Sequence, residues 1–177
     1  MSARPDASAR HDGSDSTRPR VLVRCLHEAA TLPAYALPGD AGADLTTIEE
    51  VTLAPGQRAL VRTGIALAIP DGWVGLVHPR SGLATKYGVT LVNTPGTIDA
   101  GYRGEILLNL LNTDQSTPVT LRAGDRVAQL LLQQVGYAVF EPTDSLPESS
   151  RGETGHGSTG GFTAPAQPDP ISPKDPM

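Results

Sequence analysis

The sequence predicts an all-β protein, built as a distorted β-barrel or double-sheet jelly roll with one short helix. The apolar segments are short, and they are either alternating or rich in β-branched residues. Turn signals such as Pro55-Gly56 and Pro70-Asp71-Gly72 separate them every eight to twelve residues or so, a rhythm typical of such folds. With two phenylalanines and one tryptophan, the core must be mainly aliphatic. The expected strands are residues 21–25, 51–53, 59–62, 65–69, 73–78, 90–92, 106–111, 119–121, 126–134 and 137–140.

One helix is expected at residues 83–87, with Ser81 as its N-cap and Gly88 just past its end. It follows Arg80 directly. Because a helix start offers unpaired N–H groups and a partial positive charge, this start could hold phosphate oxygens together with Arg80 and the Ser81 hydroxyl. The alternative is a capped helix beside a surface arginine.

Domain organisation follows from composition. Residues 1–20 are mostly Ser, Ala, Arg, Asp and Pro, and the chain from residue 141 is dense in Pro, Gly, Ser and Thr, so neither end can bury much apolar surface. We therefore expect a disordered tail at 1–20, one folded core at 21–140, a mobile arm at 141–162 and a disordered tail at 163–177.

Charge and cysteine content exclude several classes of protein. The N-terminal tail, core and remaining C-terminal part carry net charges of +1, −2 and −4, so none offers the basic surface that duplex nucleic acid requires. Cys25 is the only cysteine, which excludes an intrachain disulfide and a cysteine-based zinc cluster. No segment has the apolar character of a membrane span or signal peptide. We expect a cytoplasmic protein without nucleic-acid or membrane partners.

Residues 93–105 read N-T-P-G-T-I-D-A-G-Y-R-G-E, and the apolar segments 89–92 and 106–111 on either side are expected to form a long β-hairpin. About thirteen polar and turn-forming residues far exceed the two that a hairpin turn needs. The excess indicates a ligand site with Asp99 and Tyr102 in its middle, although a long exposed loop is the simpler alternative.

This stretch resembles the third of five short motifs of the trimeric deoxyuridine triphosphatases (dUTPases). The other four occur in the family's order, as P-G-D-A-G-A-D-L at 38–45, P-R-S-G-L-A at 79–84, A-G-D-R-V-A-Q-L at 123–130 and R-G-E-T-G-H-G-S-T-G-G-F at 151–162. The resemblance implies hydrolysis of dUTP to dUMP and diphosphate with Mg²⁺, by water attack on the α-phosphorus. This reaction limits uracil in DNA and supplies dUMP for thymidylate synthesis. It also implies a homotrimer with shared active sites, in which an apolar run such as 127–132 lies along the threefold axis.

The resemblance assigns catalytic roles to three side chains. Asp44 helps to hold magnesium through water, which suits an ion that keeps several waters and binds chiefly through substrate phosphates. Asp99 orients and activates the attacking water and contacts the 3′-hydroxyl, and Gln129 supports the α-phosphate or a nearby water. For each aspartate the alternative is a turn cap, and for Gln129 a solvated position on a strand.

Substrate-binding roles follow in the same way. The Tyr102 ring lies beneath the deoxyribose and leaves no room for a 2′-hydroxyl, while Asn93 and the hairpin backbone read uracil. His156 stands where a phenylalanine usually stacks on the base. Arginine forks and glycine-rich backbone N–H groups suit phosphate oxygens, and no Walker-type P-loop occurs. The other expected binding residues are Arg80, Ser81, Gly82, Gly96, Thr97, Ile98, Arg126, Arg151, Gly157, Ser158 and Thr159.

Two alternative functions stay open. A dCTP deaminase has a closely similar hairpin but places a catalytic glutamate ten residues after the aspartate, where this chain has Asn109. An amide cannot exchange protons as a carboxylate does, which argues against deamination. A regulatory protein that keeps the nucleotide pocket but acts by binding a partner is the other alternative, and the long tails are its support.

Overall fold

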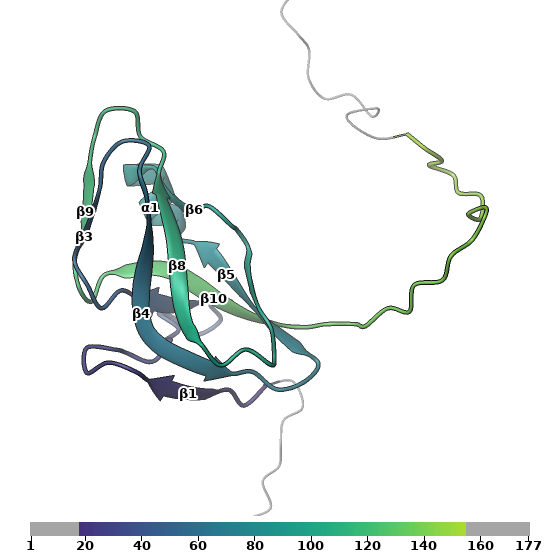
Figure 1. Ribbon diagram of the computed structural model, residues 1–177, viewed down its shortest axis with the longest axis horizontal. Coiled ribbons are helices and arrows are strands. Elements are labelled where there is room, and N and C mark those ends of the chain that lie inside the picture. The colour runs from purple at the N-terminus through teal and green to yellow at the C-terminus, as the bar shows by residue number, and fades with distance from the viewer. Residues whose placement is uncertain (1–17, 155–177) are drawn as a thin grey trace, which may run out of the picture. The chain divides into compact units, whose positions relative to one another are not determined.

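A computed structural model describes residues 18–154 of the chain (Figure 1). Short strands separated by turns make up most of this part, and the single helix α1 covers Ser81–Tyr87. The strands are β1 Leu22–Cys25, β2 Ala43–Thr46, β3 Val51–Leu53, β4 Arg58–Ala68, β5 Trp73–Pro79, β6 Val89–Leu91, β7 Gly96–Ile98, β8 Glu105–Asn112, β9 Val119–Leu121 and β10 Arg126–Gln134.

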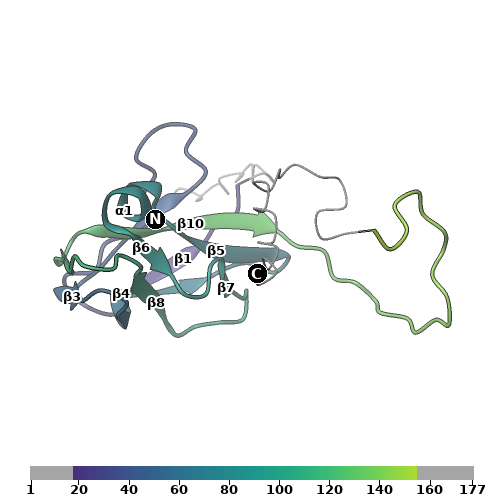
Figure 2. The ribbon, with the colours of Figure 1, turned by 90° about the horizontal axis from the view of Figure 1, so that it is seen from above.

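Two four-stranded antiparallel sheets form the body of the fold. Their strand orders are β1-β4-β8-β6 and β2-β10-β5-β7, and β3 and β9 form a separate two-stranded ribbon. Figure 2 shows β5 beside β10, which it pairs along seven residues of each strand. The predicted all-β, double-sheet class is confirmed.

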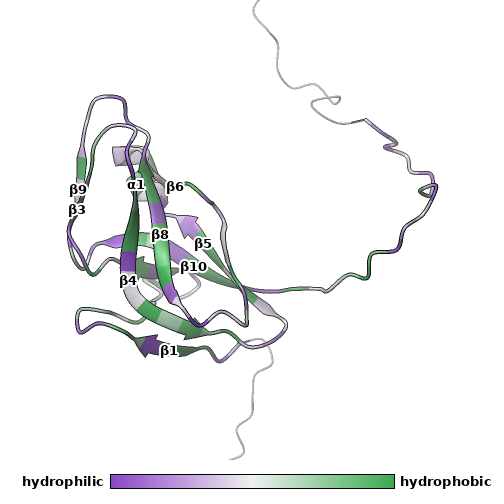
Figure 3. Cartoon of the chain, viewed as in Figure 1, coloured by the Kyte–Doolittle hydropathy of each residue, from purple (hydrophilic) through white to green (hydrophobic). Residues whose placement is uncertain are grey.

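One apolar core lies between the sheets and draws on both. Alternate residues of β8 point into it, namely Ile106, Leu108 and Leu110, and β10 of the other sheet contributes Val127 and Leu130. Figure 3 shows the apolar residues concentrated on strands such as β4 and β8, whereas α1 is mainly polar and buries no residue. Aliphatic side chains dominate this core, as the composition predicts.

The predicted strand boundaries agree closely with the structure except at four places. Residues 51–53, 119–121 and 126–134 form strands with the expected bounds. The two strands predicted at 59–62 and 65–69 are instead one strand, β4, which ends at Ala68 and whose pairing with β8 is irregular between Arg62 and Ala66. The strand predicted at 137–140 is wrong, since the last strand ends at Gln134. The short strands β2 and β7 were not predicted, because each lies within a motif dominated by turn residues.

The helix begins two residues earlier than expected. Arg80, in an extended conformation, occupies the N-cap position without a side-chain cap hydrogen bond, so the prediction of Ser81 as N-cap is wrong. Gly88 ends the helix in the left-handed region at φ 64°, as predicted, and its N–H donates to the carbonyls of Ala84 and Leu83.

The chain divides into two compact units at Tyr137. Residues 138–154 contain neither helix nor strand. The predicted tails at 1–20 and 163–177 lie mostly or wholly outside the described residues. Within 18–154, no helix combines the length and apolar character that a membrane crossing needs.

Candidate functional site

A pocket of about 200 Å³ lies at the base of the β6–β8 hairpin, where the sequence predicts a site. Strands β6 and β8 pair through Leu91 and Leu110, whereas β7, which lies in the loop between them, pairs with β5 of the other sheet through Gly96 and Val77. The loop is therefore anchored to both sheets. The pocket is smaller than the roughly 300–1,000 Å³ of sites for drug-sized ligands, which suits a nucleoside better than a whole nucleotide. Its lining is Val77, Leu91, Asn93, Gly96, Thr97, Ile98, Asp99, Tyr102, Glu105, Ile106, Leu107, Leu108 and Asn109.

The predicted hairpin residues therefore meet in one cavity. Ile98 is buried at the inner end of the pocket, whereas Asp99 and Tyr102 are exposed at its rim. A turn joins the last two, since the Tyr102 N–H donates to the Asp99 carbonyl at 3.0 Å. The Asp99 carboxylate is thus open to solvent beside a cavity lined by fixed backbone.

Asn109 lies on the pocket wall and is partly buried. This is the position at which a deaminase of similar hairpin would carry its glutamate. The wall therefore presents an amide, which hydrogen-bonds without exchanging protons.

A second group of predicted residues gathers around Asp44 on β2. Asp44 is 6% exposed, and two arginines reach its carboxylate. Arg126 Nη1 donates to Asp44 Oδ2 at 3.0 Å, and Arg80 Nε lies 2.9 Å from Asp44 Oδ1. The Arg80 contact is an ion pair without hydrogen-bond alignment, because neither of its two atoms has a hydrogen-bond partner. Asp44 Oδ1 is thus a buried acceptor that lacks a directed donor.

Gln129 lies directly across from Asp44 in the β2–β10 ladder and from His78 in the β10–β5 ladder. Gly42 makes room for its side chain, since a Cβ at position 42 would lie 3.1 Å from Gln129 Cβ and 3.3 Å from Oε1. The A-G-A-D-L motif and Gln129, more than 80 residues apart in sequence, therefore form one surface.

Helix α1 carries two of the predicted phosphate-binding residues. Ser81 and Gly82 begin the helix and are exposed, and Arg80 precedes them. Arg80 Nη1 donates to the Arg126 carbonyl at 3.2 Å, which ties the start of the helix to β10. Arg80 thus connects its own motif at 79–84 with the motif at 123–130, which contains Arg126.

The two groups do not share a cavity within one chain. The hairpin pocket is lined by none of Asp44, Arg80, Arg126 and Gln129. Arg151 is exposed and donates from Nε to the Thr154 carbonyl at 3.1 Å, in the unit after Tyr137. His156, Gly157, Ser158 and Thr159 lie outside the described residues.

The predicted threefold-axis role of residues 127–132 stays a prediction. Val127, Ala128 and Leu130 are at most 2% exposed and fill the core of their own chain, whereas Leu131 and Leu132 are only partly buried. On strands β4 and β8 themselves, the large apolar side chains that remain exposed are Leu60 and Leu107, at 61% and 42%.

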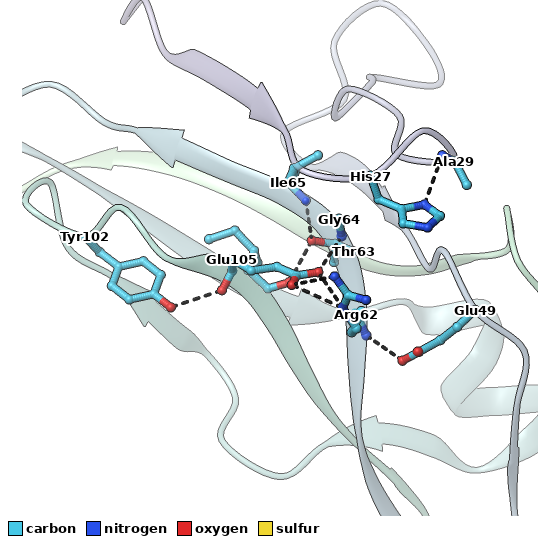
Figure 4. A network of polar contacts seen from close by, with 10 residues as sticks. His27, Ala29, Glu49, Arg62, Thr63, Gly64, Ile65, Tyr102 and Glu105 are labelled. Carbon is cyan, nitrogen blue, oxygen red and sulfur yellow. Dashed lines mark hydrogen bonds and ion pairs between the residues drawn. The ribbon is translucent and has the colours of Figure 1, made fainter.

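Sequence reasoning gave Glu105 no role in the site. Glu105 lines the pocket and pairs with Arg62, whose guanidinium lies 3.2 Å from its carboxylate (Figure 4). The two residues are 43 positions apart, so no local pattern marks the pair. For Gly104, the sequence indicates only a permissive backbone, and its role beside the Tyr102 side chain is visible only in the structure.

Known proteins share both the sequence and the fold. The family model described as dUTPase matches residues 28–160. The chain is 60% identical over 148 residues to a deoxyuridine 5′-triphosphate nucleotidohydrolase of Thermobifida fusca (strain YX), covering 84% of this chain and 83% of that protein. It is 57% identical over 148 residues to a protein of the same name from Mycobacterium tuberculosis (strain ATCC 25177 / H37Ra), covering 81% and 96%.

Solved structures agree with these relatives. A mutant Staphylococcus bacteriophage 80alpha dUTPase with dUpNHpp superposes with a TM-score of 0.75 at 28% identity, covering 80% of this chain and 98% of that one. A mutant dUTPase of phage phi11 of S. aureus, described with a structural Mg(II) ion, superposes with a TM-score of 0.68 at 27% identity, covering 73% and 99%. With five motifs in order, the matching family model and close relatives over most of its length, the chain belongs to the dUTPase family.

Proposed function

We propose that this chain is a dUTP diphosphatase that uses the hairpin pocket to hold the nucleoside of dUTP and Asp99 to activate the attacking water. The reaction class follows from family membership: dUTP is hydrolysed to dUMP and diphosphate. The observation that carries the residue assignment is the convergence of Asn93, Asp99 and Tyr102 on one nucleoside-sized cavity.

Asp99 is suited to general-base chemistry because its carboxylate is exposed at the rim, beside the position proposed for the sugar. It would take a proton from water as the water oxygen bonds to the α-phosphorus. The bond from that phosphorus to the oxygen bridging to the β-phosphate then breaks, and diphosphate leaves. A positioned general base typically accelerates such a step by about 10²- to 10⁴-fold.

Base selection would rest on the main chain between Asn93 and Ile98. This segment is fixed by β7–β5 pairing, so its N–H and C=O groups cannot rearrange to suit another base. Cytosine reverses the donor and acceptor pattern of uracil and would leave buried groups unpaired, which can discriminate by about 10⁴-fold or more.

Phosphate binding would use the second group of residues. The Arg80 and Arg126 guanidiniums and the exposed start of α1 present positive charge and donors, and Gln129 lies beside them. Arg151, His156, Gly157, Ser158 and Thr159 would complete the site from the C-terminal arm, with His156 stacked on uracil and Ser158 and Thr159 near the outer phosphates.

Magnesium suits this second group only as a water-mediated ligand. No cluster of three acidic, histidine or cysteine side chains that could hold a metal occurs between residues 18 and 154. Asp44 Oδ1, however, is a buried acceptor without a directed donor, and it could accept a hydrogen bond from a metal-bound water. Bound to the substrate phosphates, Mg²⁺ would neutralise charge and fix their geometry.

A homotrimer would bring the two groups together. Leu107 and Asn109 line the pocket from the outer face of β8, and Leu60 lies on the neighbouring strand directly opposite Asn109. A second copy seated on this exposed apolar face would lie beside the pocket mouth. Its Asp44 group, or its C-terminal arm, could then complete the site, and we propose such an arrangement in the cytoplasm.

Incubating the purified full chain with Mg²⁺ and each deoxynucleoside triphosphate tests the assignment. Diphosphate should be released from dUTP and from no other nucleotide. Ammonia release from dCTP would indicate a deaminase despite Asn109. Nucleotide binding without either product would indicate the regulatory alternative.

A further inference from the structure

The Glu105 carboxylate sits at the centre of a polar network that extends from β4 to the hairpin pocket (Figure 4). Arg62 Nε lies 3.2 Å from both carboxylate oxygens of Glu105, and Arg62 Nη2 lies 3.2 Å from Oε2. The backbone N–H of Gly64 donates to Glu105 Oε1 at 2.8 Å. The Glu105 side chain is 18% exposed, so these contacts are partly shielded from solvent.

The Glu105 carboxylate takes the place of a backbone carbonyl as hydrogen-bond acceptor for β4. Pairing between β4 and β8 shifts between Arg62 and Ala66, and Gly64 lies in this irregularity at φ 70°. Its N–H would be unpaired without Glu105, and leaving such a donor unsatisfied is costly. Thr63 adds a second tie, because its hydroxyl donates to the Ile106 carbonyl at 2.7 Å. The first two residues of β8 are therefore anchored to the bulge of β4.

The same residue also holds the Tyr102 ring. Tyr102 OH donates to the Glu105 carbonyl at 3.0 Å, so the ring folds back over the backbone between them. Gly104 permits this fold, since a Cβ at that position would lie 2.3 Å from the Tyr102 hydroxyl oxygen. Tyr102 is 46% exposed, and core packing therefore does not fix its ring. Its position depends on the Glu105 carbonyl.

We propose that Glu105, held by Arg62 and Gly64, is a positioning residue that sets sugar selectivity through Tyr102. The inference rests on the proposed function, in which this ring occupies the space that a 2′-hydroxyl would need. If the start of β8 loosens, the carbonyl moves and the ring follows. Room for the 2′-hydroxyl then opens, while the Asp99 carboxylate, on the other side of the turn, keeps its place.

The test measures kcat and KM of the full chain for dUTP and UTP, both with Mg²⁺. Displacement of a positioning contact by about 1 Å can cost up to about 100-fold. Glu105→Ala should therefore lower the ratio of kcat/KM for dUTP to that for UTP by at least about tenfold, mainly by improving UTP. Glu105→Gln keeps an acceptor for the Gly64 N–H, and it should retain most of the selectivity.

Two further variants separate positioning from a loss of stability. Asp114→Ala also removes a carboxylate that accepts backbone N–H groups in a bend, from Ser116 and Thr117, but lies outside the pocket lining. It should leave the selectivity ratio unchanged. Tyr102→Phe removes the hydroxyl bond, and adding Glu105→Ala to it should then cause little further loss.

Each outcome decides the question. A folded Glu105→Ala protein with wild-type selectivity would overturn the proposal, as would an equal loss in Asp114→Ala or a full additional loss in the Tyr102→Phe background. If the wild-type chain releases no diphosphate from dUTP, the proposed function itself fails, and this outcome is distinct from an active wild type with unaffected variants.

Discussion

Gly104→Ala perturbs the site by steric contact alone. The new methyl group would lie 2.3 Å from the Tyr102 hydroxyl oxygen and 2.6 Å from Cζ, whereas ordinary contacts begin at 3.4 Å. The hydroxyl must retreat by about 1 Å, and its 3.0 Å bond to the Glu105 carbonyl lengthens or breaks. Because the ring is 46% exposed, it can swing outward without disturbing the core.

The expected cost in stability is therefore small and the cost in selectivity large. Loss of one hydrogen bond contributes about 0.5–1.5 kcal/mol, and exposure places Tyr102 near the lower end of that range. Thermal denaturation should show a Tm lowered by no more than about 4 °C. The ratio of kcat/KM for dUTP to that for UTP should fall about 10- to 100-fold, as expected when a positioning group moves by about 1 Å.

Gly101→Ala is the matched control. It places the same methyl group three residues earlier in the same loop, where a Cβ meets nothing within 4 Å. Its selectivity should equal that of the wild type. If Gly104→Ala also keeps wild-type selectivity, the Tyr102 ring does not exclude the 2′-hydroxyl, and the sugar must be read elsewhere.

The remaining predictions concern catalysis, the arm and acid stability. Asp99→Asn should lower kcat by about 10²- to 10⁴-fold, which corresponds to roughly 3–5 kcal/mol in barrier height. The affinity for a non-hydrolysable dUTP analogue, measured by calorimetry, should change far less. Near-normal turnover would show that a group other than Asp99 is the general base. His156→Phe should preserve nucleotide affinity and His156→Ala should weaken it by roughly 1 kcal/mol, as stacking values imply; a Phe variant with normal affinity but no turnover would show instead that the imidazole transfers protons. Removing residues 151–177 should leave the core folded by circular dichroism while sharply lowering turnover, whereas removing 163–177 should do little. Hydrogen bonds from the backbone N–H groups of Ser116 and Thr117 lower the pKa of Asp114. The ionised carboxylate therefore stabilises the fold above its unfolded pKa of about 3.9. This contribution is lost as the pH falls through the lower pKa of the folded state. Asp114→Ala should therefore be less stable than wild type in denaturant titrations at neutral pH, and the difference should shrink as the pH falls below about 4.

Strand positions were largely predictable because burial on one face imposes a period of two. In β8, Ile106, Leu108 and Leu110 alternate with more polar or exposed residues, and the sequence shows that pattern directly. Residues 137–140 are also apolar and were predicted as a strand for the same reason, but they form none. Val139 and Phe140 are 85% and 93% exposed and pair with no other strand in the described chain. Local pattern cannot reveal whether a pairing partner exists.

The composition of the site was predictable only where a motif is continuous. Seven residues of the 93–105 stretch line one pocket because they are near neighbours in sequence. The Asp44–Arg80, Asp44–Arg126 and Arg62–Glu105 pairs join residues 36, 82 and 43 positions apart, which only the fold brings together. The separation of the two residue groups in one chain is a property of the sheets, and no spacing in the sequence encodes it.

The nucleoside pocket takes a large part of its lining from β8, which is also one of the two inner strands of the β1-β4-β8-β6 sheet. A ligand that binds only when β8 is correctly paired must stabilise every ladder on which that pairing depends. By mass action, a ligand at one hundred times its Kd adds about 2.7 kcal/mol to the folded state. Amide hydrogen exchange should then slow in β4 opposite the pocket, at Val61 and Leu60, whose partners on β8 are Leu108 and Asn109. Nucleotide occupancy is thus thermodynamically linked to the integrity of a sheet that lines the pocket only through β8 and Leu91 of β6.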